Sequence, residues 1–227
     1  MPTSPWKKLE DREKDREKKR DAVLRMAARF FNEKGYHATS LDDVAARLNV
    51  TKPTLYYYVK NKEEILFECV RIGLQMIDAA AKDADQRGGS AVEKLVAVAH
   101  KYAEIVTEDF GMCVIRVGED PLPPASRKKL RRLKARIDRR FRSLIEQGIA
   151  EGDLAPMDPK LAAFTLAGAI SWIARWYRPD GPLDPEEIAT QCIDILMNGL
   201  ARQPSARRRL ASKVAAARLS LSAVANE

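Results

Sequence analysis

A short polar segment gathers side chains whose hydrogen-bonding groups suit a nucleic acid. Residues 51–58, TKPTLYYY, place an amine, hydroxyls and phenols within two helical turns. Lys52 can donate to guanine and the ring of Pro53 can contact a thymine methyl group, so we expect both at base edges. The hydroxyl residues expected to bind phosphates and fix the register are Thr39, Thr51 and Thr54. The segment is too short and too polar for a core helix, and it predicts a recognition helix.

The elements that position this segment follow from capping chemistry. Ser40 is a good N-cap and Asp43, three residues later, is an acidic variant of the capping-box partner, so a helix should begin at Leu41. Asn49 should end it, because asparagine tolerates the left-handed conformation that a tight turn needs. Thr51 then caps the next helix. Two short helices joined by a tight turn form the geometry of a helix-turn-helix.

The run TKPTLYYYVKNKEEIL, residues 51–66, resembles the signature of the TetR family of bacterial repressors. In that family a turn leads into a short recognition helix, then a tyrosine, an aromatic cluster and a Lys-Glu pair that opens a long fourth helix. Tyr56 falls on the family tyrosine and Lys62 on its phosphate-contacting lysine. Val59 and Pro53 depart from the usual phenylalanine and small residue.

The resemblance also implies roles for the other aromatic residues and for the helix that follows. Tyr56, Tyr57 and Lys62 should contact phosphates. The other role open to the tyrosines is packing, and we expect Tyr58 to lie mostly in the core. A long helix from Lys62 to about residue 86 would join a DNA-reading domain to a ligand-binding domain.

Helical patterns dominate the whole chain. Period-two alternation is nearly absent, and Ala, Leu, Glu, Lys and Arg are abundant. We predict an all-α protein with an N-terminal three-helix helix-turn-helix DNA-binding domain and a C-terminal helical ligand-binding and dimerisation domain. The expected segments are residues 1–19 as a charged helical extension or arm, 20–66 as the helix-turn-helix domain, 67–203 as the ligand-binding and dimerisation domain, and 204–227 as a basic, Ala-rich tail.

Composition and charge limit the compartment and the partners. The 227 residues include 40 Lys and Arg against 32 Asp and Glu, a net charge of +8, which favours a polyanionic partner. Cys69, Cys113 and Cys192 are far apart and lack CxxC spacing, which indicates a reducing compartment without disulfides. No apolar run approaches the roughly 20 residues of a membrane-spanning helix, and the amino end is charged. We therefore expect a soluble cytoplasmic protein with no membrane partner.

Residues suited to catalysis or metal binding are sparse. The two histidines, His37 and His100, are far apart and no Cys motif accompanies them, so we predict no metal site and no cofactor. His100 lies among apolar residues, where a histidine is more often packed than a ligand. No nucleophile elbow, phosphate loop or pair of catalytic carboxylates is recognisable, so we predict no catalytic residues and no enzymatic activity.

Two charged runs leave alternatives open. Residues 7–20 alternate in sign at helical spacing and form either a solvated helix or an arm that adds phosphate or minor-groove contacts. Residues 127–142 hold ten Lys and Arg against the single acid Asp138, on faces opposite an apolar stripe. Those faces meet solvent or neighbouring DNA, or they bind the phosphates of a ligand such as a coenzyme A thioester.

A helix that is apolar nearly all round is expected at residues 161–177. In a soluble protein such a helix must be buried on every side. That condition is met most simply if it and the next helix, residues 185–200, pair with their copies in a second subunit as a four-helix bundle. The residues assigned to this homodimer interface are Phe164, Gly168, Ile188 and Ile195.

The run SWIARWYRPDGPLDPEEIA, residues 171–189, is similar to the carboxyl part of TetR-type regulators of lipid and acyl-CoA catabolism. Its tryptophans and arginines could stack on an adenine and pair with phosphates, or the tryptophans could fill the dimer interface. The residues expected to line a ligand pocket, each of which could equally be core, are Met76, Phe110, Met112, Trp172, Arg175 and Trp176.

These expectations combine into a ligand-responsive transcriptional regulator, most simply a repressor. It would bind a near-palindromic, double-stranded operator as a homodimer, with two recognition helices in successive major grooves. A small, largely apolar effector, with an acyl-CoA thioester as one candidate, would stabilise a state that no longer matches the operator. The alternative from another class is a small-molecule binding or carrier protein without a DNA role.

Overall fold

The described part of the chain is built from helices. A computed structural model of the protein describes residues 9–86 and 88–198, and within these ranges it contains nine helices and no strand. The helices are α1 (Leu9–Lys34), α2 (Leu41–Arg47), α3 (Lys52–Tyr58), α4 (Lys62–Gln86), α5 (Ala91–Ile105), α6 (Asp109–Arg116), α7 (Pro124–Glu151), α8 (Pro159–Trp176) and α9 (Pro185–Asn198). The prediction of an all-α protein is confirmed.

The chain divides into two compact units, residues 1–189 and 190–227, and the boundary falls inside α9. Helices α1 to α8 belong to the first unit. The predicted division into four segments stays a prediction. The basic tail, residues 204–227, and the first eight residues of the arm lie outside the described residues.

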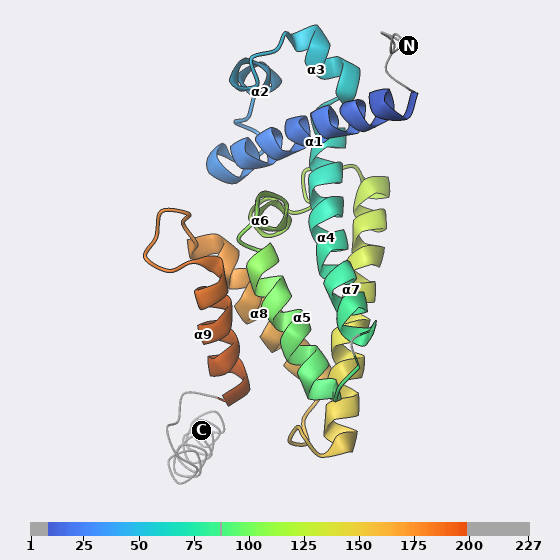
Figure 1. The fold of residues 1–227 in the computed structure, drawn as a ribbon, viewed down its shortest axis with the longest axis vertical. Coiled ribbons are helices and arrows are strands. Elements are labelled where there is room, and N and C mark those ends of the chain that lie inside the picture. The colour runs from blue at the N-terminus through green and yellow to red at the C-terminus, as the bar shows by residue number, and fades with distance from the viewer. Residues whose placement is uncertain (1–8, 87, 199–227) are drawn as a thin grey trace, which may run out of the picture. The chain divides into compact units, whose positions relative to one another are not determined.

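Helices α1, α2 and α3 form a head at the start of α4 (Figure 1). One face of α1 packs against α2, α3 and α4 through small and large apolar side chains. Its buried residues are Val23, Leu24, Ala27, Ala28 and Phe31. This stripe at helical spacing is what makes α1 the support for the two shorter helices.

Local capping fixes the starts of α2 and α3. The Ser40 hydroxyl accepts a hydrogen bond from the Asp42 N–H at 3.1 Å, and α2 begins at Leu41 as predicted. The capping-box role expected of Asp43 is wrong, because Ser40 bonds one position earlier and the Asp43 carboxylate lies 3.9 Å from Lys34. The left-handed turn at Asn49 is confirmed by its φ of 57°.

The long helix α4 leads from the head into the body, where it packs against α5, α6 and α7 (Figure 1). Helix α5 begins with a capping box of Ser90 and Glu93, which satisfies two backbone N–H groups. Helix α7 begins at Pro124, because a proline suits the first helical turn. Asp158 caps α8 by accepting from the Leu161 N–H at 2.9 Å.

Half of the ten basic residues in the run on α7 form ion pairs with acids of the same chain: Arg131, Lys134, Arg136, Arg140 and Arg142. Asp78 of α4 accepts from Arg136 at 2.8 Å and lies 3.3 Å from Lys82, and it is buried. Burial opposes the ionisation of Asp78, but the hydrogen bonds from Arg136 and Lys82 outweigh it and lower its pKa. Buried Glu119 pairs in the same way with Arg131 and Lys134.

No helix within the described ranges is long and apolar enough to cross a membrane.

Candidate DNA-reading surface and ligand cavity

Helix α3 turns nearly all of its side chains outward. Leu55 is its buried residue, and Val59, directly after the helix, is buried as well. In contrast to these two buried residues, Tyr57 is 65% exposed. The exposed side chains, which we call the reading surface, are Thr51, Lys52, Pro53, Thr54, Tyr56 and Tyr57. A seven-residue helix held by so few apolar contacts is positioned to enter a groove rather than to form a core.

The amine of Lys52 is already engaged in the free protein. Its Nζ lies 2.9 Å from a carboxylate oxygen of Asp42 in the first turn of α2. The hydrogen bond to Asp42, and the attraction of its charge, raise the pKa of Lys52. A contact between Lys52 and a base therefore requires the amine to leave Asp42 or to share its donors with it.

Lys62 ties the start of α4 to the loop before α2. Its Nζ donates to the carbonyl of His37 at 3.2 Å and lies 4.5 Å from the centre of the Tyr36 ring. Partial burial lowers the pKa of Lys62. An ammonium group has three donors, so the predicted phosphate contact is compatible with the bond to His37.

Two expected contacts near the reading surface differ in the structure. Thr39 is only 3% exposed, and its hydroxyl donates to the Gly35 carbonyl at 2.8 Å. Its assignment to a phosphate is therefore corrected: Thr39 closes the turn after α1. Tyr58 is half-buried rather than mostly core, and its ring meets the edge of Tyr57 at 5.1 Å between centroids.

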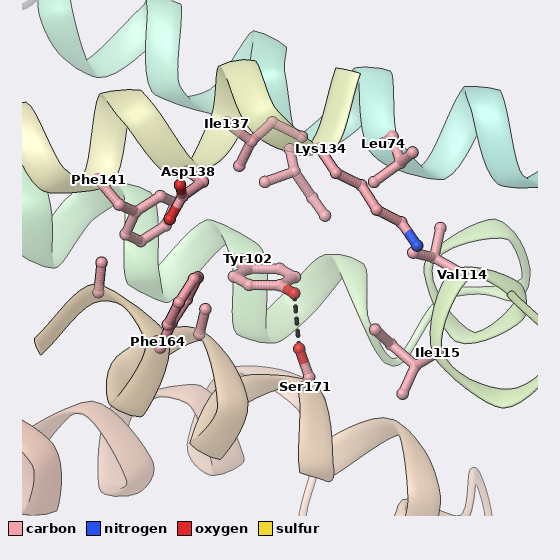
Figure 2. Close-up of a pocket in the computed structure, with 13 residues that line it drawn as sticks. Leu74, Tyr102, Val114, Ile115, Lys134, Ile137, Asp138, Phe141, Phe164 and Ser171 are labelled. Carbon is pink, nitrogen blue, oxygen red and sulfur yellow. Dashed lines mark hydrogen bonds between the residues drawn. The ribbon is translucent and has the colours of Figure 1, made fainter. Parts of the chain in front are cut away.

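The body holds an apolar cavity of about 250 Å³ between α4, α5, α6, α7 and α8 (Figure 2). Its walls consist mainly of aliphatic and aromatic side chains, and two alanines and a serine of α8 leave the space open. The lining residues are Leu74, Ile77, Tyr102, Val114, Ile115, Lys134, Ile137, Asp138, Phe141, Ala163, Phe164, Ala167 and Ser171.

A few polar side chains also line this cavity. The hydroxyls of Tyr102 and Ser171 form a hydrogen bond to each other at 2.7 Å at the wall of the cavity (Figure 2). Burial raises the pKa of the Tyr102 phenol. Lys134 carries a positive charge that its pairing with Glu119 balances. The Asp138 carboxylate also lines the cavity and pairs with Arg142. An apolar pocket with two hydroxyls, a paired amine and a paired carboxylate suits a mostly apolar ligand with one polar group.

The residues predicted to bind a ligand lie outside this cavity. Phe110 is buried against the head, with the Arg25 guanidinium 4.9 Å from its ring centre, and Met76 is half-buried on α4. Trp172 is 65% exposed. The residues that do line the cavity were missed because their side chains read as ordinary core in the sequence, and five helices must pack before the space exists.

Three of the predicted ligand residues, Met112, Arg175 and Trp176, come together in a second groove of about 780 Å³ beside α1 and α6. There Arg116, at the end of α6, donates to the Tyr177 carbonyl after α8 at 3.1 Å. Arg175 donates in turn to the Ile115 carbonyl near the end of α6 at 2.7 Å. Burial and then the neighbouring Arg175 charge lower the pKa of Arg116. Each arginine thus satisfies carbonyls at the end of the other's helix.

Helix α8 is not buried on every side within one chain. Phe164 is 52% exposed, and the other exposed residues of the same stripe are Leu161, Gly168 and Trp172. Two of the four predicted interface residues, Phe164 and Gly168, thus lie on an open apolar face, and Ile195 is exposed as well. Ile188 is only 3% exposed, so its assignment to a subunit interface is corrected to the core of its own subunit.

The described residues contain no group of three or more His, Cys, Asp or Glu side chains that could hold a metal ion.

A three-helix head with an outward-facing two-turn helix, joined by one long helix to a body with an apolar cavity, defines a helix-turn-helix regulator with a ligand-binding domain. Residues 23–69 match the family described as bacterial regulatory proteins, tetR family, and residues 88–200 match the tetracyclin repressor-like C-terminal domain. The chain belongs to the TetR family of bacterial transcriptional regulators.

Individual relatives agree with this assignment. The transcriptional repressor KstR2 of Mycolicibacterium smegmatis is 25% identical over 195 residues, which span 81% of this chain and 91% of KstR2. The regulator PfmR of Thermus thermophilus is 33% identical with a TM-score of 0.72, over 79% of this chain and 99% of PfmR. AibR, solved with isovaleryl coenzyme A and operator DNA, is 28% identical with a TM-score of 0.70, over 78% of this chain and 97% of AibR. The protein is therefore a DNA-binding transcriptional regulator. These relatives favour this class over a small-molecule carrier without a DNA role.

Proposed function

We propose that the protein is a homodimeric repressor that leaves a near-palindromic operator when the acyl group of a coenzyme A thioester occupies the cavity between α4 and α8. The observation that carries this proposal is the position of α6, which forms a wall of the cavity and also touches the head. Val114 and Ile115 of α6 line the cavity. A ligand there can favour one placement of the head only if it binds that state better than the other.

Several contacts between α6 and the head are polar and specific. Asp109 accepts from Arg29 of α1 at 2.9 Å, and the Asp109 carbonyl accepts from the Asn32 side chain at 2.9 Å. At the other end of α6, Arg116 donates to the Asn32 carbonyl at 3.4 Å. A displacement of α6 by a ligand would therefore be passed to α1, which supports the recognition helix.

The size of the cavity favours a short acyl group. Its volume of about 250 Å³ is below the roughly 300 Å³ at which pockets for drug-sized ligands begin, so a whole coenzyme cannot enter. Phe164 lines the cavity and is 52% exposed, so the cavity reaches the surface beside the open face of α8. The nucleotide would remain outside the cavity. AibR, which was solved with isovaleryl coenzyme A, supports a short acyl thioester as the class of ligand.

The open face of α8 supports the homodimer. Leu161, Phe164 and Trp172 leave an apolar stripe unpaired within one chain, and Gly168 between them lets a second helix approach closely. A second copy of the same stripe would cover it in a symmetric contact, which is the commonest way for a soluble chain to form an oligomer.

The proposal is tested by fluorescence anisotropy on the DNA immediately upstream of the protein's own gene. Isovaleryl coenzyme A, longer acyl thioesters and free coenzyme A are then added to the complex. We expect short acyl thioesters to release the DNA and free coenzyme A to leave it bound. Saturable DNA binding that no thioester affects would exclude the proposed effector.

A pair of tyrosine variants shows whether release acts through the cavity. Tyr102→Phe removes the hydroxyl that faces the cavity, whereas Tyr177→Phe removes one from an equally buried tyrosine outside it. We expect Tyr102→Phe to raise the effector concentration needed for half-release by about 2- to 12-fold, the range of one hydrogen bond. Tyr177→Phe should leave it unchanged. Equal effects of the two variants would place the effector elsewhere.

A further inference from the structure

The amino-terminal part of α1 extends beyond the helices that it supports. The buried stripe of α1 begins at Val23, yet the helix starts at Leu9, and residues 11–19 are exposed or half-exposed. This extension is anchored at its base, where Arg20 lies 3.2 Å from Glu64 and 3.5 Å from Glu68 of α4. Because those contacts fix the direction of α1, the extension has a defined place beside the head.

The extension reaches the reading surface through one side chain. The guanidinium carbon of Arg16 lies 5.5 Å from the centre of the Tyr57 ring on α3. Figure 1 shows the amino-terminal half of α1 passing next to α3. Within the described ranges Arg16 forms no ion pair with a carboxylate, in contrast to Arg20, whose charge two glutamates balance.

We infer that Arg16 is a DNA-backbone contact, and that it binds a phosphate adjacent to the one met by Tyr57. A guanidinium that stacks on an aromatic ring keeps its N–H groups free in the ring plane, where they can donate two parallel bonds to a phosphate. Tyr57 is the most exposed aromatic residue of α3, so a cation on its ring shares its access to DNA. The inference rests on DNA binding and is independent of the proposed effector and dimer.

The salt dependence of DNA binding distinguishes a phosphate contact by Arg16 from a role in which Arg16 only positions Tyr57. Neutralising one phosphate releases condensed counterions and contributes about 0.9 to the slope of log affinity against log salt. Without Arg16 the slope should become shallower by about 0.9. The ratio of wild-type to variant affinity should then change about 3.5-fold for a fourfold change in salt concentration. Phosphate contacts carry no sequence information, so operator and random DNA should be affected alike.

The experiment compares Arg16→Gln with Lys18→Gln in the full-length protein. Both variants lose one exposed charge from the same part of α1, but Lys18 is two residues away and therefore points to the far side of the helix. Affinity for a random duplex and for the upstream DNA is measured between about 50 and 200 mM KCl, and thermal unfolding is recorded for each variant. Arg16→Gln should show the shallower slope on both duplexes, and Lys18→Gln should keep the wild-type slope.

Two results would overturn the inference. An unchanged slope for Arg16→Gln, with weaker binding only to the upstream DNA, would show that Arg16 merely positions Tyr57. Equal slope changes in the two variants would show a long-range charge effect without a contact. Arg16→Lys retains the charge and should retain the slope, which separates loss of contact from misfolding. Loss of the effector response with the Arg16 effect intact would remove only the proposed effector.

Discussion

Replacing Gly73 by alanine should destabilise the protein, although alanine is the better helix former. A Cβ atom at Gly73 of α4 would lie 2.5 Å from the Phe110 carbonyl oxygen and 2.7 Å from a methyl carbon of Val114, both on α6. The oxygen belongs to the backbone, so the whole of α6 must move. Overpacking of this kind costs about 1–3 kcal/mol, and the helix propensity of alanine returns about 1 kcal/mol. The net destabilisation should be about 0–2 kcal/mol.

Gly148→Ala in α7 is the matched control for this change. Gly148 is also a buried helical glycine, but its added Cβ would meet only side-chain atoms, with Leu154 at 3.0 Å and Val92 at 3.2 Å. Those side-chain ends can shift by a few tenths of an ångström, so the propensity gain of about 1 kcal/mol should offset most of the crowding. The variant should therefore be nearly neutral or slightly stabilised.

Urea unfolding of both variants at one protein concentration measures the difference, because dimer formation would make the midpoint depend on concentration. In thermal unfolding each kcal/mol corresponds to about 2–4 °C for a chain of this size. A Gly73→Ala protein at least as stable as Gly148→Ala would refute the close α4–α6 contact on which this reasoning depends.

Three further changes test other parts of the molecule. Folding lowers the pKa values of Asp78 and Glu119, so both carboxylates stabilise the protein fully above their unfolded pKa values. This stabilisation is lost as the pH falls below about 4 and through the folded pKa values. Urea unfolding from about pH 3 to 7 should show the loss, and the loss should be smaller in Asp78→Asn. Leu161→Arg should weaken the proposed dimer in sedimentation equilibrium. Met157→Arg, at a residue that is also exposed but lies outside α8, should not weaken it. Equal dimer dissociation constants for the two variants would contradict the proposed interface. Lys52→Ala should reduce the preference for operator over random DNA in anisotropy titrations, and an unchanged preference would remove Lys52 from the base contacts.

Local chemistry accounts for most of what the sequence predicts correctly. The start of α2 at Leu41 and the left-handed Asn49 each depend on residues within four positions of one another. Such interactions hardly depend on the rest of the fold. The error at Ser40 is also local, since two acids follow it and the hydroxyl bonds to the N–H of the first.

The site depends on contacts between distant segments, and these are less visible in the sequence. Lys52 meets Asp42 only because α2 and α3 pack side by side, and this pairing had no signature in spacing. The cavity is formed by residues from five helices, so none of its lining is marked by a motif. Ile188 shows a related limit: an apolar stripe indicates burial, but it does not distinguish the subunit's own core from an interface.

The same close contact that makes Gly73 sensitive also constrains how a ligand could act. At Gly111 of α6 an added Cβ would lie 1.8 Å from the Ile105 carbonyl at the end of α5, and at Gly73 it would lie 2.5 Å from α6. Backbone packed this closely leaves no room for α6 to slide past α4 or α5. By contrast, α6 meets α1 partly through the buried Phe110 and partly through exposed or half-buried polar pairs, such as Arg29 with Asp109. The polar pairs can re-form after a small shift. A ligand that expands the cavity would therefore move α6 together with its apolar neighbours, and the adjustment would fall on the polar contacts with α1 of the DNA-reading head.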